Sequence, residues 1–148
     1  MSAAALPGEA PRVFVFELEM PIRWGDMDAM GHVNNTVYFR YMEQLRIAWF
    51  DAMGFQRDPG GEGLVVVETG CSFRRELRYP GTVLLRQHVD EIGRSSLRTY
   101  VELSRTDDPQ TLYASGTATL VWVDHRQKRS VAWPDTMRRA LTEPCLRR

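Results

Sequence analysis

Apolar and polar positions alternate through the first ordered part of the chain. From Phe14 to Trp24 every second residue is hydrophobic, and most residues between them are charged. A period of two is typical of a strand with one buried face. The preceding segment, residues 1–12, is rich in small residues and interrupted by proline. We therefore expect a flexible N-terminal segment over 1–12 and a single folded domain over 13–148.

The period changes to that of a helix between Thr36 and Met53. Hydrophobic residues recur there at steps of three and four, and they form a stripe wide enough to bury most of the helix. Asn34 or Asn35 is expected to cap the first turn, because an asparagine side chain can accept a hydrogen bond from a free amide. Gly54 is expected to end the helix.

Further strand-like segments follow the helix, separated by turn sequences such as RYPGT and RTDDPQ. The first contains LVVVE and is apolar on both faces, so we expect it to cross the core. A short closing helix is expected near Pro134. This order predicts an α+β fold in which one sheet of about five strands surrounds one long helix. The four segments that follow the long helix are 64–77, 83–92, 97–104 and 112–123.

Composition and charge exclude few functions. The 19 basic and 19 acidic residues give a net charge of +0, so no charge excess points to nucleic acid or a membrane surface as partner. The two cysteines lack metal-binding spacing. No signal peptide is apparent, and no apolar run approaches the roughly 18 residues of a membrane span. A reduced, cytoplasmic protein is expected.

The stretch WGDMDAMGHVNN, residues 24–35, contains the candidate chemistry. Its D-x-D-x-x-G opening is typical of calcium loops, but Met30 and Val37 occupy positions that require oxygen ligands. The scattered histidines do not form a zinc motif, so no metal site is predicted. A polar strand-to-helix turn requires no function, because Asp and Asn favour turns. A catalytic turn is the alternative, since a carboxylate beside free helix amides can promote acyl-transfer hydrolysis.

The segment RWGDMDAMGHVNNTVYFRYMEQLR closely resembles the hotdog-fold thioesterases of the 4-hydroxybenzoyl-CoA and acyl-CoA thioesterase group. The resemblance continues in FRRELRYPGTVLL, GRSS and YASGTATLVWVD, and so covers about residues 13–135. It implies a hotdog fold, with one antiparallel sheet wrapped around the central helix. It also implies hydrolysis of acyl-CoA or acyl-carrier-protein thioesters without a cofactor. A hotdog acyl-CoA-binding domain without turnover, and a hotdog dehydratase or hydratase, stay open as alternatives.

The resemblance assigns roles within the turn. Asp28 matches the catalytic carboxylate, which acts as general base or as nucleophile, and Asp26 matches its supporting partner. The thioester carbonyl is expected to face a backbone amide near Asn35. His32 is expected either to position substrate or water, or to hydrogen-bond a turn carbonyl.

Other positions are matched outside the turn. Arg94, Ser95 and Arg129 correspond to positions that contact coenzyme A phosphates in relatives, where the arginine fork suits the ligand. Glu43 lies on the helix, where some relatives use a catalytic carboxylate. We expect Glu43 instead to be buried and hydrogen-bonded between helix and sheet.

The resemblance also predicts assembly. Hotdog subunits pair edge to edge, which covers exposed sheet edges and places the active site between two chains. A homodimer or homotetramer is therefore expected. Glu68 and Thr69, in the second strand, are expected to face Asp28 of the partner subunit.

Overall fold

The computed structural model describes residues 12–55, 58 and 60–145. The predicted flexible segment 1–12 lies outside this range apart from Arg12. Five long strands form one antiparallel sheet, and a sixth of two residues pairs with the end of β5, so the sheet has one short strand more than predicted. The strands are β1 (Val13–Pro21), β2 (Glu62–Phe73), β3 (Thr82–Ile92), β4 (Ser96–Arg105), β5 (Ala114–Asp124) and β6 (Arg129–Ser130).

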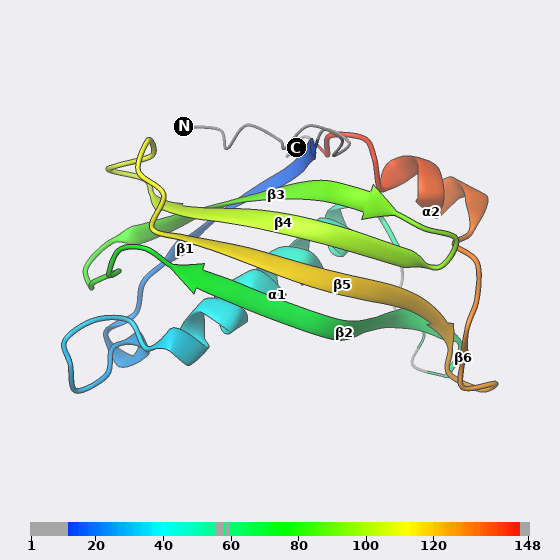
Figure 1. Ribbon diagram of the computed structural model, residues 1–148, viewed down its shortest axis with the longest axis horizontal. Coiled ribbons are helices and arrows are strands. Elements are labelled where there is room, and N and C mark those ends of the chain that lie inside the picture. Colours follow the sequence, from blue (N-terminus) through cyan, green and yellow to red (C-terminus); the bar gives the residue numbers. More distant parts are fainter. Residues whose placement is uncertain (1–11, 56–57, 59, 146–148) are drawn as a thin grey trace.

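The long strands follow the order β1-β3-β4-β5-β2. Helix α1 (Asn35–Ala52) crosses one face of the sheet, and the short helix α2 (Asp135–Ala140) lies at the end where β3 turns into β4 (Figure 1). A single 3-10 turn, η1 (Trp24–Asp26), follows β1. This architecture confirms the predicted α+β hotdog fold.

Helix α1 begins and ends where the sequence predicts. The Asn34 side chain caps it by accepting a hydrogen bond from the Thr36 amide, and Gly54 follows its end with a φ of +81°. Five side chains on one face are buried, whereas much of the opposite face is exposed, so the helix is less buried than predicted. The buried residues are Tyr38, Tyr41, Met42, Leu45 and Trp49.

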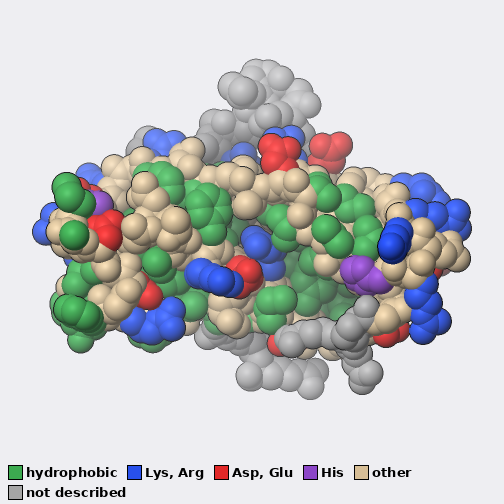
Figure 2. Space-filling view, turned by 90° about the horizontal axis from the view of Figure 1, so that it is seen from below, with side chains coloured by type: hydrophobic (Ala, Val, Ile, Leu, Met, Phe, Trp, Pro, Cys, Tyr) green, Lys and Arg blue, Asp and Glu red, His purple; other side chains and the backbone are tan. Residues whose placement is uncertain are grey.

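Strand β2 does not cross the core, and this prediction was wrong. It lies at one edge of the sheet, and within the described residues it pairs only with β5. Val65, Val66 and Val67 are 36%, 41% and 58% exposed. A bulge near Val67 interrupts the pairing. The face seen from below, toward β2 and α1, accordingly carries many hydrophobic side chains between charged ones (Figure 2). The apolar residues on both faces of β2 therefore belong to an edge strand that its own chain leaves partly exposed.

Candidate active site

The polar stretch between β1 and α1 folds into a tight turn. Met27 and Val33 form an isolated antiparallel bridge. Within it, the Asp28 amide donates to the His32 carbonyl at 3.0 Å, and the Gly31 amide donates to the Asp28 carbonyl at 3.0 Å. Gly31 has a φ of +82°, which glycine adopts without steric strain. The turn therefore folds back so that Asp28 lies beside the amino end of α1.

Both carboxylate oxygens of Asp28 accept hydrogen bonds. The Met30 amide donates to Oδ1 at 2.9 Å, and the Asn34 side-chain amide donates to Oδ2 at 3.1 Å. These two bonds fix the orientation of the carboxylate. The residue is only partly buried, so a substrate or a water molecule can reach it.

Asn34 links this carboxylate to the helix. Its Oδ1 accepts hydrogen bonds from the Thr36 amide at 2.9 Å and from the Thr36 hydroxyl at 2.6 Å. Its Nδ2 is the donor to Asp28. One side chain thus caps α1 and orients the candidate catalytic group. Sequence reasoning identified the cap position but missed the bond to Asp28.

Asp26 anchors the turn to the core. It is 6% exposed, and its Oδ2 accepts hydrogen bonds from the Arg23 amide at 2.9 Å and from the Tyr41 hydroxyl at 2.7 Å. Burial alone would raise the pKa of Asp26, but these hydrogen bonds and the Arg23 charge lower it. Burial and the bond to Asp26 raise the pKa of Tyr41, so its hydroxyl stays protonated and donates. The geometry matches the supporting position expected for Asp26.

The first turn of α1 offers a free amide. Asn35 is the first helical residue and is exposed, and among the described residues its N–H has no hydrogen-bond acceptor. The next amide, of Thr36, is already bound to Asn34. The Asn35 amide is therefore free to donate to an oxygen from outside the chain.

His32 contacts the connection between β2 and β3. Its Nε2 lies 3.6 Å from Oε1 of Glu76, and its Nδ1 lies 3.5 Å from the Val33 carbonyl oxygen. Arg78 donates to the other Glu76 oxygen at 2.7 Å, and this bond and the charge on His32 lower the pKa of Glu76. Asp28 and His32 share the backbone bond of the turn, but within the described residues no hydrogen bond or ion pair joins the His32 ring to the Asp28 carboxylate. The His32 ring therefore contacts Glu76 and the turn backbone at Val33.

The predicted coenzyme A contacts lie far from Asp28 of the same chain. The Asp28 turn is held at the start of β3 by a bond from the Ile22 amide to the Gly81 carbonyl. Arg94 and Ser95 follow the other end of β3, which spans 11 residues or about 35 Å. Arg129, in β6, lies at that same far end (Figure 1). One chain alone does not bring these residues to Asp28.

Glu43 is exposed, so the prediction of a buried glutamate was wrong. Its carboxylate pairs with Arg40 at 2.9 Å, and its side chain is 53% exposed. Glu43 lies on a side of α1 that the sheet of its own chain does not cover. The expected position between helix and sheet is therefore not the one that Glu43 occupies.

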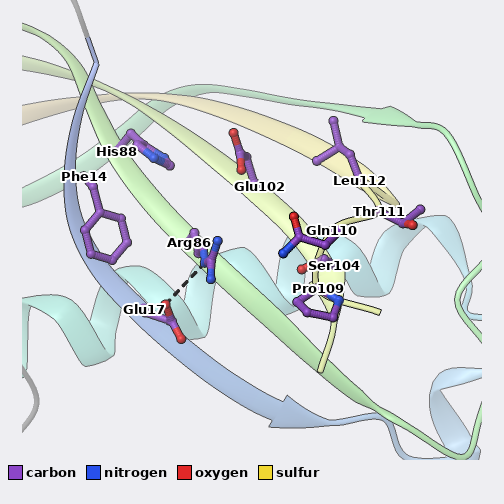
Figure 3. Close-up of a pocket in the computed structure, with 10 residues that line it drawn as sticks. All are labelled: Phe14, Glu17, Arg86, His88, Glu102, Ser104, Pro109, Gln110, Thr111 and Leu112. Carbon is purple, nitrogen blue, oxygen red and sulfur yellow. Dashed lines mark hydrogen bonds and ion pairs between the residues drawn. The ribbon is translucent and has the colours of Figure 1, made fainter. Parts of the chain in front are cut away.

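Sequence reasoning missed the two larger of the cavities found among the described residues. One, of about 510 Å³, lies on the sheet face turned away from α1 (Figure 3). It contains the Glu17–Arg86 ion pair at 3.3 Å, with His88 and Glu102 beside it. Burial lowers the pKa of His88. None of the turn residues lines this cavity, so it is not part of the Asp28 site.

The second cavity, of about 540 Å³, lies between α1 and β2. Most of its buried lining is hydrophobic. It combines residues from distant parts of the sequence, which explains why no local pattern predicted it.

The described part of the chain contains no group of three or more His, Cys, Asp or Glu residues placed to hold a metal ion. No helix in that part has the length and hydrophobicity required to cross a membrane.

Comparison with known proteins gives concordant matches. A sequence profile of the thioesterase-like superfamily matches residues 22–141. PA2801 of Pseudomonas aeruginosa, provisionally assigned as a thioesterase, is 39% identical, with a TM-score of 0.82 over 86% of this chain and 98% of that one. XC229 of Xanthomonas campestris, provisionally an acyl-CoA thioesterase, is 31% identical, with a TM-score of 0.68 over 76% of this chain and 95% of that one. The acyl-acyl carrier protein thioesterase ATL3 of Arabidopsis thaliana is 28% identical over 128 residues, which are 82% of this chain and 65% of ATL3.

Proposed function

Because the chain belongs to the thioesterase-like superfamily, we propose that it hydrolyses acyl-CoA or acyl-carrier-protein thioesters with Asp28 as the catalytic carboxylate. The observation that carries this proposal is the geometry of the turn. A carboxylate held by two hydrogen bonds lies directly before a helix whose first amide is free. The names of XC229 and ATL3, which refer to acyl-CoA and acyl carrier protein, support these two thiol carriers.

The reaction follows from these groups. As general base, Asp28 takes a proton from water while the water oxygen bonds to the thioester carbon. The carbonyl oxygen becomes an oxyanion that accepts a hydrogen bond from the Asn35 amide. Collapse of this intermediate breaks the carbon–sulfur bond, and the leaving thiolate receives the proton from Asp28.

A nucleophilic route uses the same geometry. Asp28 attacks the carbonyl carbon and expels the thiolate, which forms a mixed anhydride that water then hydrolyses. In both routes the bonds from Met30 and Asn34 keep the carboxylate oriented.

The site requires two chains. Asp28 lies at one end of the sheet and Arg94, Ser95 and Arg129 lie at the other, so they serve one substrate only if different subunits supply them. Antiparallel pairing of two β2 edges about a two-fold axis brings opposite ends together. The open β2 edge and its exposed valines support this arrangement. Glu68 and Thr69 lie near the middle of β2, at the interface of such a homodimer, and two dimers could form a homotetramer.

The test is thiol release from a panel of acyl-CoAs by the wild type and Asp28→Asn. We expect the variant to fold with an unchanged melting temperature and to lose about 10²- to 10⁴-fold in kcat. Asp90→Asn, an aspartate in β3 paired with arginines, is the control and should keep full activity. Full turnover by Asp28→Asn would refute its assigned role.

The same assay separates the alternatives. Saturable acyl-CoA binding without thiol release by the wild type would indicate a binding domain. Addition or removal of water on the acyl chain without thiol release would indicate a hydratase or dehydratase.

A further inference from the structure

The cavity between α1 and β2 has a hydrophobic interior and a charged rim. Glu43, Asp51, Asp58 and Glu62 line it, and all four are exposed. Figure 2 shows hydrophobic side chains in a hollow near the centre of this face. The hydrophobic lining residues are Ile47, Phe50, Phe55, Leu64, Val66, Trp122 and Met137.

The cavity lies beside the start of β2, far from Asp28 of its own chain. This step rests on the proposed function and its two-chain site. Antiparallel pairing about the middle of β2 sets Glu62 of one chain against the partner's Phe73. Phe73 packs against Tyr38 in the first turn of α1, with ring centroids 4.9 Å apart. The partner's Asp28 turn, which precedes this helix, would therefore lie at the cavity mouth.

We infer that this cavity holds the acyl group, and that the preferred acyl group is an aliphatic chain of medium or long length. A cavity of about 150 Å³ is enough for benzene, and this one is about 540 Å³. A single aromatic ring would leave most of it unfilled.

The polar groups of the interior favour the same conclusion. The indole N–H of Trp122 donates to Glu62 at 2.9 Å and is not free for a phenolic oxygen. Arg46 is partly buried along the lining, and burial lowers its pKa. Its hydrocarbon stem can pack against an alkyl chain. The walls thus offer mainly hydrophobic contact, for which each added methylene strengthens binding about fourfold.

The experiment measures kcat/KM for butanoyl-, octanoyl-, dodecanoyl-, hexadecanoyl- and benzoyl-CoA. We expect kcat/KM to rise along the aliphatic series until the chain fills the cavity, and to exceed the benzoyl-CoA value by at least about tenfold. A preference for benzoyl-CoA over every aliphatic substrate would overturn the inference.

A variant tests the location of the acyl group. Ile47 lies on the helix side of the cavity and is 40% exposed, so Ile47→Trp can fold while filling part of the space. The dodecanoyl to butanoyl ratio of kcat/KM should fall at least about tenfold, equivalent to two lost methylene contacts. Leu112→Trp, in the cavity on the other sheet face, is the matched control and should keep the wild-type ratio.

Two failures are distinguishable. Absence of Asp28-dependent hydrolysis for every thioester would refute the proposed function. Asp28-dependent hydrolysis with a chain-length profile that Ile47→Trp does not change, in a variant that melts like the wild type, would refute only the acyl cavity. Melting temperatures of both tryptophan variants establish that each is folded.

Discussion

At the scale of single residues, Asn34 connects stability with chemistry. Its oxygen accepts the hydrogen bonds that cap α1, and its nitrogen donates to Asp28. At neutral pH an aspartate at position 34 could accept the capping hydrogen bonds, but it has no N–H to donate to Asp28. It would also add a negative charge beside Asp28. An asparagine therefore meets both requirements in this turn.

Replacement of Asn34 by serine separates the two roles. A serine hydroxyl can still cap the helix, but its side chain is too short to reach Asp28. We expect Asn34→Ser to lower kcat about 10- to 100-fold through loss of orientation. Its free energy of unfolding should stay within about 0.5 kcal/mol of the wild type. Steady-state kinetics and urea unfolding measure these quantities.

Asn34→Ala is the comparison. It should lose a similar factor in kcat and, in addition, about 1 kcal/mol of stability with the cap. If the serine variant keeps full turnover, Asn34 acts only as a helix cap.

The residues differ in how far the sequence predicted them. The resemblance pointed to Asp28, and composition alone left an ordinary turn as a valid alternative. The Asn34–Asp28 bond depends on a six-residue separation closed by the Met27–Val33 bridge, and no local pattern specifies that closure. The contact of His32 with Glu76 joins positions 44 residues apart in the chain and was equally hidden.

At the scale of elements, the proposed mechanism assigns the oxyanion donor to the amino end of α1. Asn35→Pro would delete this amide at a helix position that tolerates proline. Asn34 has the extended conformation, with φ −61° and ψ 140°, that a residue before proline prefers. We expect Asn35→Pro to lower kcat about 10²- to 10³-fold. Circular dichroism should show that the helix remains.

Asn35→Ala keeps the backbone amide and is the control. It should retain kcat within a few-fold of the wild type. Equal losses in the two variants would assign the effect to the asparagine side chain and contradict a backbone donor.

Periodicity predicted whether a segment is a helix or a strand more reliably than it predicted how buried that helix or strand is. Helix α1 forms where its pattern predicts and buries one face. Strand β1 forms too, but it ends at Pro21, before Trp24, and a bulge between Phe14 and Phe16 leaves Phe14 38% exposed, so its predicted apolar face is only partly buried. For β2 the run of valines was consistent with a central strand, but the strand is an edge. A sequence pattern records which faces are hydrophobic and cannot distinguish a face covered by the same chain from one left for another.

At the scale of the whole molecule, the proposed two-chain site requires groups from both ends of the sheet. Asp28→Asn and Arg94→Glu should each be nearly inactive alone at low substrate concentration. In a mixed dimer, one site receives Asp28 from one chain and Arg94 from the other and is intact. Equal co-expression makes about half mixed dimers, so activity should recover to about a quarter of the wild type.

The control for this complementation combines Asp28→Asn with Asn35→Pro. Both groups belong to the same turn, so a mixed dimer has no intact site and should show no recovery. Absence of recovery in the Asp28→Asn and Arg94→Glu mixture, with mixed dimers present by mass spectrometry, would contradict a site shared between chains.

The separation of Asp28 from Arg94 also bears on how activity depends on concentration. A correctly folded single chain would carry every required residue and still be unable to act, since its own two ends cannot meet. Below the dissociation constant of the dimer, the rate would then vary with the square of chain concentration. Dilution alone would abolish activity by dissociating the dimer, without unfolding the chains. A substrate that contacts both chains would stabilise the dimer and oppose this loss of activity.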